Sequence, residues 1–481
     1  MNNKILNAAK WSIFCEILAK VIAPITTIVL ARLLSHEVFG IVASLTAITS
    51  FADLLADAGF NAYIIQHQFS TEEEKRGVYN ISFWSNFGIA CILFFIIIIN
   101  SEVFSRLVGA AGYNEVLIIA SIVIPLVSIS SIEMAIMKKE LEFKKLGIIR
   151  IVSKLVPFFV TIPLAFCGAG YWSLVIGTLV GETIGTILSI RFGGLIPKFT
   201  FKFEYLRGIF SFSIWAYLES ILEWLISNIA ILCLATIYGM AELGVFKVGI
   251  NLINQITTSV YSLYSNVYKS AISKEQNDRE LFRNIFMNFQ RYASLFSLPL
   301  GVGVYLYQDA VTQILLGDGW QDASIIIGLY GLTSTMSISY GNFYSDAIRA
   351  KGFPRFLVYI DAIYLFSIGV LLLSAQTLDF RTFCVFFCAL KIIQPLMQIV
   401  TGRKICSISI RSVIKNSFPQ ILATSTVFIV VVLFNLNKLQ SYQLIAGLCL
   451  CIFTYIAIVV VTMPEFRRID NIKNIIKRNN I

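Results

Sequence analysis

The chain has no polar stretch long enough to form a separate soluble domain. Only 14% of its 481 residues are charged, 57% are hydrophobic, and the mean hydropathy is +0.78. Apolar blocks recur throughout, and each has about the 20 residues that a helix needs to cross a bilayer. The composition therefore predicts an all-α, polytopic membrane protein. A cleavable signal peptide is not expected, because the first apolar segment is too long and lacks an A-x-A end.

Histidine is nearly absent, since only His36 and His67 occur, and both lie in predicted turns on opposite sides of the membrane. The nine cysteines fall nearly all inside apolar segments, where cysteine behaves as a small hydrophobic residue. Cys384 and Cys388 share a helix face, but no histidine accompanies them. We therefore expect no metal site and no cofactor.

Long loops are also missing. The longest segments between apolar blocks are residues 66–77, 101–114, 192–205 and 269–283, followed by a tail after Pro464. A membrane enzyme that processes glycans, such as a polymerase or an acyltransferase, would need a large external loop, or a histidine or paired acids near the interface. The sequence therefore predicts a protein that is not an enzyme.

Hydropathy places about fourteen membrane-spanning helices along the chain. The predicted spans are residues 11–34, 40–65, 78–100, 115–136, 147–167, 171–191, 206–236, 243–268, 284–307, 323–347, 355–374, 381–402, 414–435 and 441–462. Most basic residues between spans fall on the side of the two termini, and the other side holds only Arg32, Arg106, Lys247, Arg381 and Lys438. The positive-inside rule therefore places both termini in the cytoplasm.

The net charge of +10 is thus a signal of topology. The basic run MKKELEFKKLG, from Met137 to Gly147, is interpreted as a solvated cytoplasmic loop that attracts anionic headgroups. Nucleic-acid binding is not expected, because no basic patch with stacking aromatic residues is present.

The two halves of the chain show a weak internal repeat. A shift of 204 residues aligns Trp11 with Trp215, Gly40 with Gly244, and the charged loop EEEKR at 72–76 with QNDRE at 276–280. Six helices per repeat give both halves the same orientation, a parallel repeat about an axis along the membrane normal. We predict a first lobe of helices 1–6 at residues 1–192 and a second lobe of helices 7–12 at 193–402. Helices 13 and 14 occupy 403–462, and a cytoplasmic tail covers 463–481.

Basic residues inside predicted spans are candidates for binding an anionic substrate. They are Lys20, Arg150, Lys154, Arg291 and Lys391. Arg150 and Lys154 are one helical turn apart, and like charges in this arrangement repel unless an anion or solvent separates them. Two plainer interpretations remain open: Glu16 and Lys20 form a structural i, i+4 pair, and Arg150 only extends its side chain to the interface. Phosphate groups are the anions that basic side chains most often hold.

Acidic residues inside the spans are candidates for proton or Na⁺ coupling. They are Asp53 and Asp57 on one helix face, Glu219 and Glu223 on another, Glu182 and Asp361. The alternative is that these acids only neutralise the basic set.

Six segments resemble bacterial polysaccharide (Wzx-type) flippases of the multidrug/oligosaccharidyl-lipid/polysaccharide (MOP) superfamily. The similarity is to the branch that includes the colanic acid and teichuronic acid exporters, and it extends over roughly residues 5–460. The segments are LARLLSHEVFG (30–40), FADLLADAGFNAYIIQ (51–66), MKKELEFKKLGI (137–148), GAGYWSLVIGTLVGE (168–182), LLGDGWQDASIII (315–327) and AIRAKGFPRF (347–356). Asp57 falls in the D-x-G-F segment of this family, whereas His36 replaces a frequent proline.

This resemblance implies two six-helix lobes around a central, commonly cationic cavity, with two helices added. It also implies a flippase of the bacterial inner membrane that moves undecaprenyl-pyrophosphate-linked oligosaccharide to the periplasmic leaflet by alternating access. The product would be O-antigen of lipopolysaccharide, capsule or exopolysaccharide, and other glycan-assembly proteins such as a polymerase are possible partners. Two alternatives are a cation-coupled drug exporter of the same fold and a purely structural member of a glycan-assembly complex.

Overall fold

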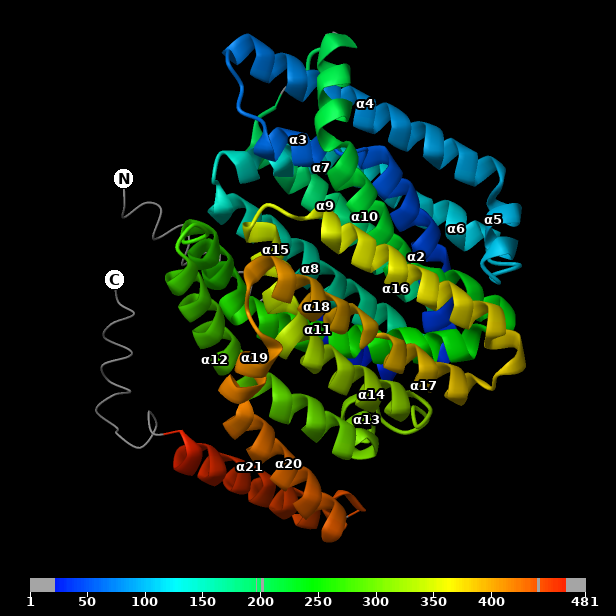
Figure 1. Cartoon of the computed structure of the whole chain (residues 1–481). Coiled ribbons are helices and arrows are strands. Elements are labelled where there is room, and N and C mark those ends of the chain that lie inside the picture. Colours follow the sequence, from blue (N-terminus) through cyan, green and yellow to red (C-terminus); the bar gives the residue numbers. More distant parts are fainter. Residues whose placement is uncertain (1–21, 196, 200–202, 439–441, 464–481) are drawn as a thin grey trace. The chain divides into compact units, whose positions relative to one another are not determined.

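The computed structural model describes residues 22–195, 197–199, 203–438 and 442–463, and every regular element within them is a helix (Figure 1). The first part of the chain forms α2 (His36–Asp57), α3 (Phe60–Gln66), α4 (Glu72–Ile99), α5 (Ser101–Leu107), α6 (Asn114–Ser121), α7 (Val123–Lys139), α8 (Phe143–Phe166) and α9 (Tyr171–Gly193). The second part begins with α10 (Phe203–Ile237), α11 (Met240–Lys274), α12 (Arg279–Leu306), α13 (Gln308–Leu316), α14 (Ala323–Met336), a π-helical turn (Ser337–Gly341) and α15 (Asn342–Ala350). It ends with α16 (Arg355–Ser374), α17 (Phe380–Leu390), α18 (Ile393–Cys406), α19 (Ile410–Asn416), α20 (Phe418–Leu433) and α21 (Tyr442–Thr462).

The prediction of an all-α, multi-pass membrane protein is confirmed. Among the described residues nine helices are long and apolar enough to cross a membrane, or ten if α19 and α20, which meet at 62°, form one span. Each predicted span from 40–65 onward coincides with one helix or with two consecutive helices, and the span at 323–347 coincides with α14, the π-helical turn and α15. Of the span at 11–34, residues 22–34 are described and contain the apolar helix Ile22–Ala31. The rest of this span lies outside the described residues, and the count of fourteen stays a prediction.

Two predicted features differ in detail from the structure. The second predicted span is broken, because Ala58 and Gly59 adopt positive φ angles of 42° and 85° between α2 and α3. Glycine has no Cβ and therefore tolerates this conformation, which gives the D-x-G-F segment a structural role as the break. The predicted loop at 101–114 contains the short helix α5, and α13 occupies the corresponding place in the second half.

The described helices group into two compact units. The first consists of residues Met1–Val248 and Ile368–Phe380, and the second of Gly249–Ser367 and Arg381–Ile481. The helix α10 packs against α2, α3 and α4 of the first unit. In the second unit α20 and α21 lie side by side, and α20 packs against α12 (Figure 1). The predicted lobe boundaries at 192 and 402 stay predictions.

The repeated charged loops cap equivalent helices. Thr71 is the N-cap of α4, and its hydroxyl oxygen accepts a hydrogen bond from the backbone N–H of Glu74 at 3.1 Å. Asp278 caps α12 in the same way, accepting from the N–H groups of Glu280 and Leu281 at 2.9 Å each. Such caps satisfy N–H groups that have no partner within the helix. Under the shift of 204 residues Thr71 aligns with Glu275, so the two caps are offset by three residues, and the charged loops share a side-chain cap at the start of the helix but not at the same position.

Small residues allow α2 and the start of α11 to cross at close range within the first unit. A Cβ atom on Gly40 would overlap the carbonyl oxygen of Met240, and one on Gly244 would overlap the carbonyl oxygen of His36. The shift of 204 residues relates Gly40 to Gly244 and His36 to Met240. The crossing is thus symmetric under exchange of the two repeats, and only glycine fits at both positions.

We predict that Gly40→Ala destabilises the protein, because the added methyl group overlaps a backbone carbonyl that cannot rotate away. Overpacking of this kind typically costs about 1–3 kcal/mol, measurable as a lower thermal unfolding temperature in detergent. Gly88→Ala on α4 is the matched control, since its Cβ would meet no atom within 4 Å. Equal stability of the two variants would contradict the tight crossing.

Candidate binding and coupling sites

The structure brings together three of the predicted coupling acids in the first unit. Asp53 and Asp57 lie one turn apart on α2, and Glu182 lies on α9, which packs against α2. The carboxyl group of Asp53 is within electrostatic range of both Asp57 and Glu182. These side chains are neither fully buried nor fully exposed. They form an acidic cluster at the end of α2 where the helix breaks.

Asp57 also has a structural role at this break. Its Oδ1 atom accepts a hydrogen bond from the backbone N–H of Asn61 at 3.3 Å, at the start of α3. Lys138 of α7 acts electrostatically on Asp57, and Arg150 acts on Lys138. The sequence interpretation placed Lys138 in a solvated loop, because the predicted span ended at residue 136. In the structure α7 continues to Lys139 and carries Lys138 to the acidic cluster.

Arg150 and Lys154 are exposed on consecutive turns of α8. Within the part of the chain that the structure describes, neither side chain forms a hydrogen bond or an ion pair. The helix itself has the length and hydropathy of a membrane span. A charge facing hydrocarbon costs at least about 2.5 kcal/mol, so two unpaired cations at this position indicate contact with water or with an anionic ligand.

The remaining predicted coupling acids of the first unit lie on α10. Glu219 and Glu223 are one turn apart on this helix, which contacts α2 through Trp224. The indole Nε1 of Trp224 donates a hydrogen bond to Ser50 Oγ at 3.0 Å, and its ring lies 4.5 Å from that of Phe51. The contact of Trp224 therefore holds the part of α10 that carries Glu219 and Glu223 against α2, the helix that carries Asp53 and Asp57.

A broken helix organises the polar residues of the second unit. The predicted span at 381–402 consists of α17 and α18, and Lys391 lies in the break between them. The ammonium group of Lys391 donates to the Tyr330 hydroxyl at 2.9 Å and lies 4.3 Å from the ring centre. Gln394 Nε2 donates to Asp361 Oδ1 at 2.8 Å, and Asp361 is 7% exposed. Breaks in membrane helices are common at binding sites, and this one brings Lys391 and Asp361 into one neighbourhood.

The other predicted cations are distributed over the chain. Arg291 lies on α12 of the second unit, where its backbone carbonyl accepts a hydrogen bond from Gln420 Nε2 of α20 at 3.2 Å. Lys20 lies outside the described residues. The structure thus places two predicted cations in each unit, and a shared cationic cavity stays a prediction.

Two buried acids were missed by the sequence interpretation. Glu133 of α7 is 3% exposed, and it accepts a hydrogen bond from the backbone N–H of Leu195 at 3.0 Å. Gly193 leaves the space for this carboxyl group, since a Cβ there would overlap Glu133 Oε2. Asp346 of α15 is 8% exposed and accepts a hydrogen bond from the Tyr261 hydroxyl. Both acids lie inside predicted spans, and the same criterion that selected the other coupling candidates, an acid within a span, would have identified them.

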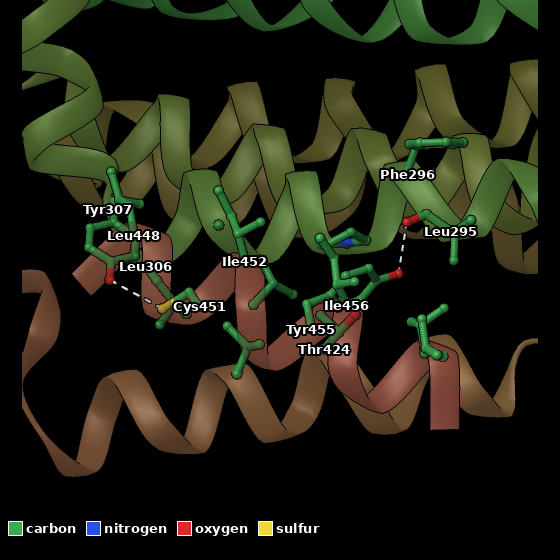
Figure 2. Close-up of a pocket in the computed structure, with 16 residues that line it drawn as sticks. Leu295, Phe296, Leu306, Tyr307, Thr424, Leu448, Cys451, Ile452, Tyr455 and Ile456 are labelled. Atoms are coloured by element: carbon green, nitrogen blue, oxygen red, sulfur yellow. Dashed lines mark hydrogen bonds between the residues drawn. The ribbon is translucent and has the colours of Figure 1, made fainter. Parts of the chain in front are cut away.

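An apolar pocket lies between α12, α20 and α21 (Figure 2). It has a volume of about 480 Å³, and its lining includes Phe296, Leu306, Val427, Ile452 and Ile456. The three hydroxyl groups of its lining all have partners. Tyr455 OH donates to the Leu295 carbonyl oxygen at 2.7 Å, Thr424 Oγ1 donates to the Gln420 carbonyl oxygen at 2.7 Å, and Tyr307 OH lies 3.5 Å from Cys451 Sγ (Figure 2). The pocket therefore suits a hydrocarbon chain.

Among the described residues, no group of three or more His, Cys, Asp or Glu side chains has the arrangement of a metal site. The sites that the structure offers are thus cations, carboxylates and an apolar pocket.

The fold is that of membrane transporters of the MOP superfamily. A solved structure of the lipid II flippase MurJ, in an inward closed conformation, superposes with a TM-score of 0.76 at 14% identity over 95% of this chain and 99% of that one. An inward-facing multidrug resistance MATE transporter of the MOP superfamily superposes with a TM-score of 0.61 at 14% identity, over 81% of this chain and 94% of the other. At such identities the likeness concerns the fold alone.

The chain belongs to the polysaccharide biosynthesis protein family, whose family model matches residues 29–325. It is 24% identical over 357 residues to the lipopolysaccharide biosynthesis protein WzxC of Escherichia coli K12, covering 73% of this chain and 71% of WzxC. It is 21% identical to the teichuronic acid biosynthesis protein TuaB of Bacillus subtilis, over 78% and 77% of the two chains. The succinoglycan biosynthesis transport protein ExoT of Rhizobium meliloti is 22% identical, over 64% of this chain and 62% of ExoT. The resemblance found from the sequence segments is confirmed.

We predict that Gln394→Leu destabilises the second unit, because the buried Asp361 carboxylate loses a hydrogen-bond donor. The expected cost is about 1–3 kcal/mol, measured as a fall in the thermal unfolding temperature. Gln443→Leu on α21 is the matched control, since Gln443 is exposed. A Gln394→Leu protein as stable as this control would show that the Gln394–Asp361 bond contributes nothing.

Proposed function

We propose that the protein is a flippase that moves undecaprenyl-pyrophosphate-linked oligosaccharide from the cytoplasmic to the outer leaflet of the bacterial plasma membrane. One observation carries this proposal: Arg150 and Lys154 are unpaired, exposed cations on consecutive turns of a membrane-length helix, in a chain of the polysaccharide biosynthesis protein family. A doubly charged diphosphate is the natural ligand for such a pair, because basic side chains form charge-assisted hydrogen bonds with phosphate oxygens.

The names of the relatives support the same class of cargo. WzxC and TuaB are named for the biosynthesis of lipopolysaccharide and teichuronic acid, ExoT is named a transport protein of succinoglycan biosynthesis, and MurJ is named a lipid II flippase. All four names concern bacterial glycans or their lipid-linked precursors. Transport of such a precursor requires no covalent step, so the protein is not an enzyme.

Each chemical part of the cargo binds to a different group of residues. The diphosphate pairs with the basic set, Lys20, Arg150, Lys154, Arg291 and Lys391. The sugars occupy the hydrated space that these charges require. The polyprenyl chain is hydrocarbon, and the apolar pocket between α12, α20 and α21 offers it a lining of aliphatic and aromatic side chains (Figure 2).

Carboxylates supply the coupling to an ion gradient, with H⁺ or Na⁺ as the coupling ion. The candidates are Asp53, Asp57, Glu182, Glu219, Glu223 and Asp361. Binding of a cation to a cluster of like charges removes repulsion between the carboxylates, and the alternation of the protein between its two open states can use this free energy. Both termini lie in the cytoplasm, and glycan-assembly proteins such as a polymerase are the expected protein partners.

A drug exporter is the second candidate, because the MATE transporters share the fold. An exporter of cationic drugs requires an acidic and aromatic cavity, and two unpaired cations would repel such drugs. The charge of Arg150 and Lys154 therefore favours the anionic cargo.

Deletion of the gene should abolish the surface polymer and cause lipid-linked repeat units to accumulate in the cytoplasmic leaflet. Surface polysaccharide and extracted lipid-linked oligosaccharide are the two measurements. Single repeat units at the surface without polymer would indicate a polymerase, and an unchanged glycan with new drug sensitivity would indicate an exporter.

Complementation then tests the cations. Single replacement of Lys20, Lys154 or Arg291 by Ala should reduce export about tenfold, the effect of losing one charged hydrogen bond, with unchanged protein abundance. A triple alanine variant of the exposed cations Arg76, Arg106 and Lys274 is the control and should retain export. Full export by the combined Lys20, Lys154 and Arg291 variant would refute the role of the cations.

The pocket is tested by photolabelling with a benzophenone-bearing polyprenyl phosphate. We expect labelled peptides from α21, and Ile452→Trp should reduce labelling several-fold because the indole ring fills the pocket. Ile445→Trp is the matched control, since Ile445 is exposed on the same helix and does not line the pocket. Equal labelling of both variants would place the lipid chain elsewhere.

A further inference from the structure

Asp346 is a buried carboxylate that holds two side chains of a neighbouring helix. It lies on α15, and it is 8% exposed. The hydroxyl group of Tyr261 donates a hydrogen bond to its Oδ2, and the ammonium group of Lys269 lies 3.7 Å from its Oδ1. Lys269 also lies 5.5 Å from the ring centre of Tyr261. Both oxygens of Asp346 are therefore engaged by α11.

Aromatic contacts continue this junction between α11 and α15. The rings of Tyr264 and Phe343 stack at 5.5 Å with an interplanar angle of 9°. The hydroxyl group of Tyr268 donates to the Phe343 carbonyl oxygen at 3.0 Å. This carbonyl follows the π-helical turn Ser337–Gly341, where the regular hydrogen-bond pattern is interrupted. The charged contact of Asp346 is thus the titratable part of an otherwise aromatic clamp.

We infer that Asp346 is a proton-binding site that opens and closes the clamp between α11 and α15. With Asp346 ionised, the carboxylate attracts Lys269 and accepts a strong hydrogen bond from Tyr261, and the helices are joined. A proton taken from solution neutralises the carboxylate, so the attraction for Lys269 is lost and the Tyr261 bond weakens. The clamp is closed at high pH and opens as the pH falls.

The ligand is a proton and not a metal cation. Oδ2 already accepts a hydrogen bond from Tyr261, and the ammonium group of Lys269, 3.7 Å from Oδ1, repels a second cation at the same place. The groups that act electrostatically on Asp346 are Tyr261, Tyr264, Tyr268 and Lys269 of α11 and Arg349 of α15. On α18, which also packs against α15, Arg403 acts on Tyr344. Asp346 is thus the acid on which the groups of α11 and α15 act.

The first repeat contains a related arrangement with the charges exchanged. There the acid, Asp57, lies on α2 and the cation, Lys138, lies on α7. In the second repeat the equivalent of α2 is α11, which carries the cation Lys269, and the equivalent of α7 ends in α15, which carries the acid. Under the shift of 204 residues Asp57 aligns with Tyr261, the hydrogen-bond donor to Asp346. Each repeat therefore carries one acid and one cation on its second and fourth helices. They form an ion pair in the second repeat, whereas in the first repeat they interact only electrostatically.

The role of Asp346 in transport rests on the proposed function, but its protonation and the opening of the clamp do not depend on the cargo. The test is therefore made on the full chain in lipid nanodiscs without substrate. Amide hydrogen exchange is followed by mass spectrometry at pH 8 and pH 5.5, with correction for the intrinsic exchange rate, for peptides that cover 258–274 and 342–350.

In the wild-type protein we expect exchange in these peptides to be about tenfold faster at the lower pH, the effect of losing one charged hydrogen bond. Asp346→Asn should show the faster exchange at both pH values. Lys269→Met should begin to lose protection at a higher pH than wild type, because the cation favours the ionised acid. Asp309→Asn on α13 is the matched control, since Asp309 is exposed, and it should behave like wild type.

Two results overturn the inference. One is exchange in wild type that does not change with pH. The other is a pH response that persists in Asp346→Asn, which would assign it to a different group. Should Asp346→Asn fail to fold, Lys269→Met decides, because an unshifted response in that variant contradicts the pairing. Loss of polymer export has no part in these outcomes, so failure of the clamp and failure of the flippase proposal are distinguishable.

Discussion

A charged side chain inside a membrane-length helix needs either a partner or water, and this constraint determines where the charged side chains of the protein lie. Several charged groups satisfy it with a partner in the same unit: Lys391 with the Tyr330 hydroxyl, Asp361 with Gln394, and Asp346 with Tyr261 and Lys269. Arg150 and Lys154 satisfy it by exposure on α8. Because desolvation of an unpaired charge costs several kcal/mol, the exposed pair marks where the protein admits water or an anion, and the paired groups mark where helices are joined.

Irregular backbone accompanies these polar groups. Asp57 stands where α2 gives way to α3, Lys391 stands between α17 and α18, and the π-helical turn Ser337–Gly341 precedes Asp346. A break in a membrane helix frees backbone N–H and C=O groups, which must find other partners. Asp57 provides one of these partners by accepting the N–H of Asn61. Each break therefore interrupts the regular backbone hydrogen bonding at or near a polar side chain, and at the first break that side chain replaces a missing backbone acceptor.

The two repeats share a helix plan but bury different surfaces. In the first, α2 buries small residues such as Ala43, Ala47 and Ala56. In the second, α11 contributes Tyr261, Tyr264 and Tyr268 to an aromatic cluster with Phe343. Small residues let helix backbones approach closely, whereas tyrosines fill a wider gap and bring hydroxyl groups that hydrogen-bond to a buried acid. The two halves thus share an order of helices but differ in the side chains packed between them.

Much of the fold of this protein can be predicted from the sequence alone, because the length of each apolar segment and the distribution of basic residues between segments can be read along the chain. The helical class, the positions of the spans from residue 40 onward, the repeat and the family are all present in the order of residues. Only the tertiary structure shows which charged and polar side chains interact with one another. Lys138 lies two residues beyond its predicted span yet acts electrostatically on Asp57. The Tyr261 hydroxyl finds its hydrogen-bond acceptor in Asp346, which is 85 residues away in the chain. Such pairs depend on the rotation and the breaks of packed helices, and neither is encoded in hydropathy.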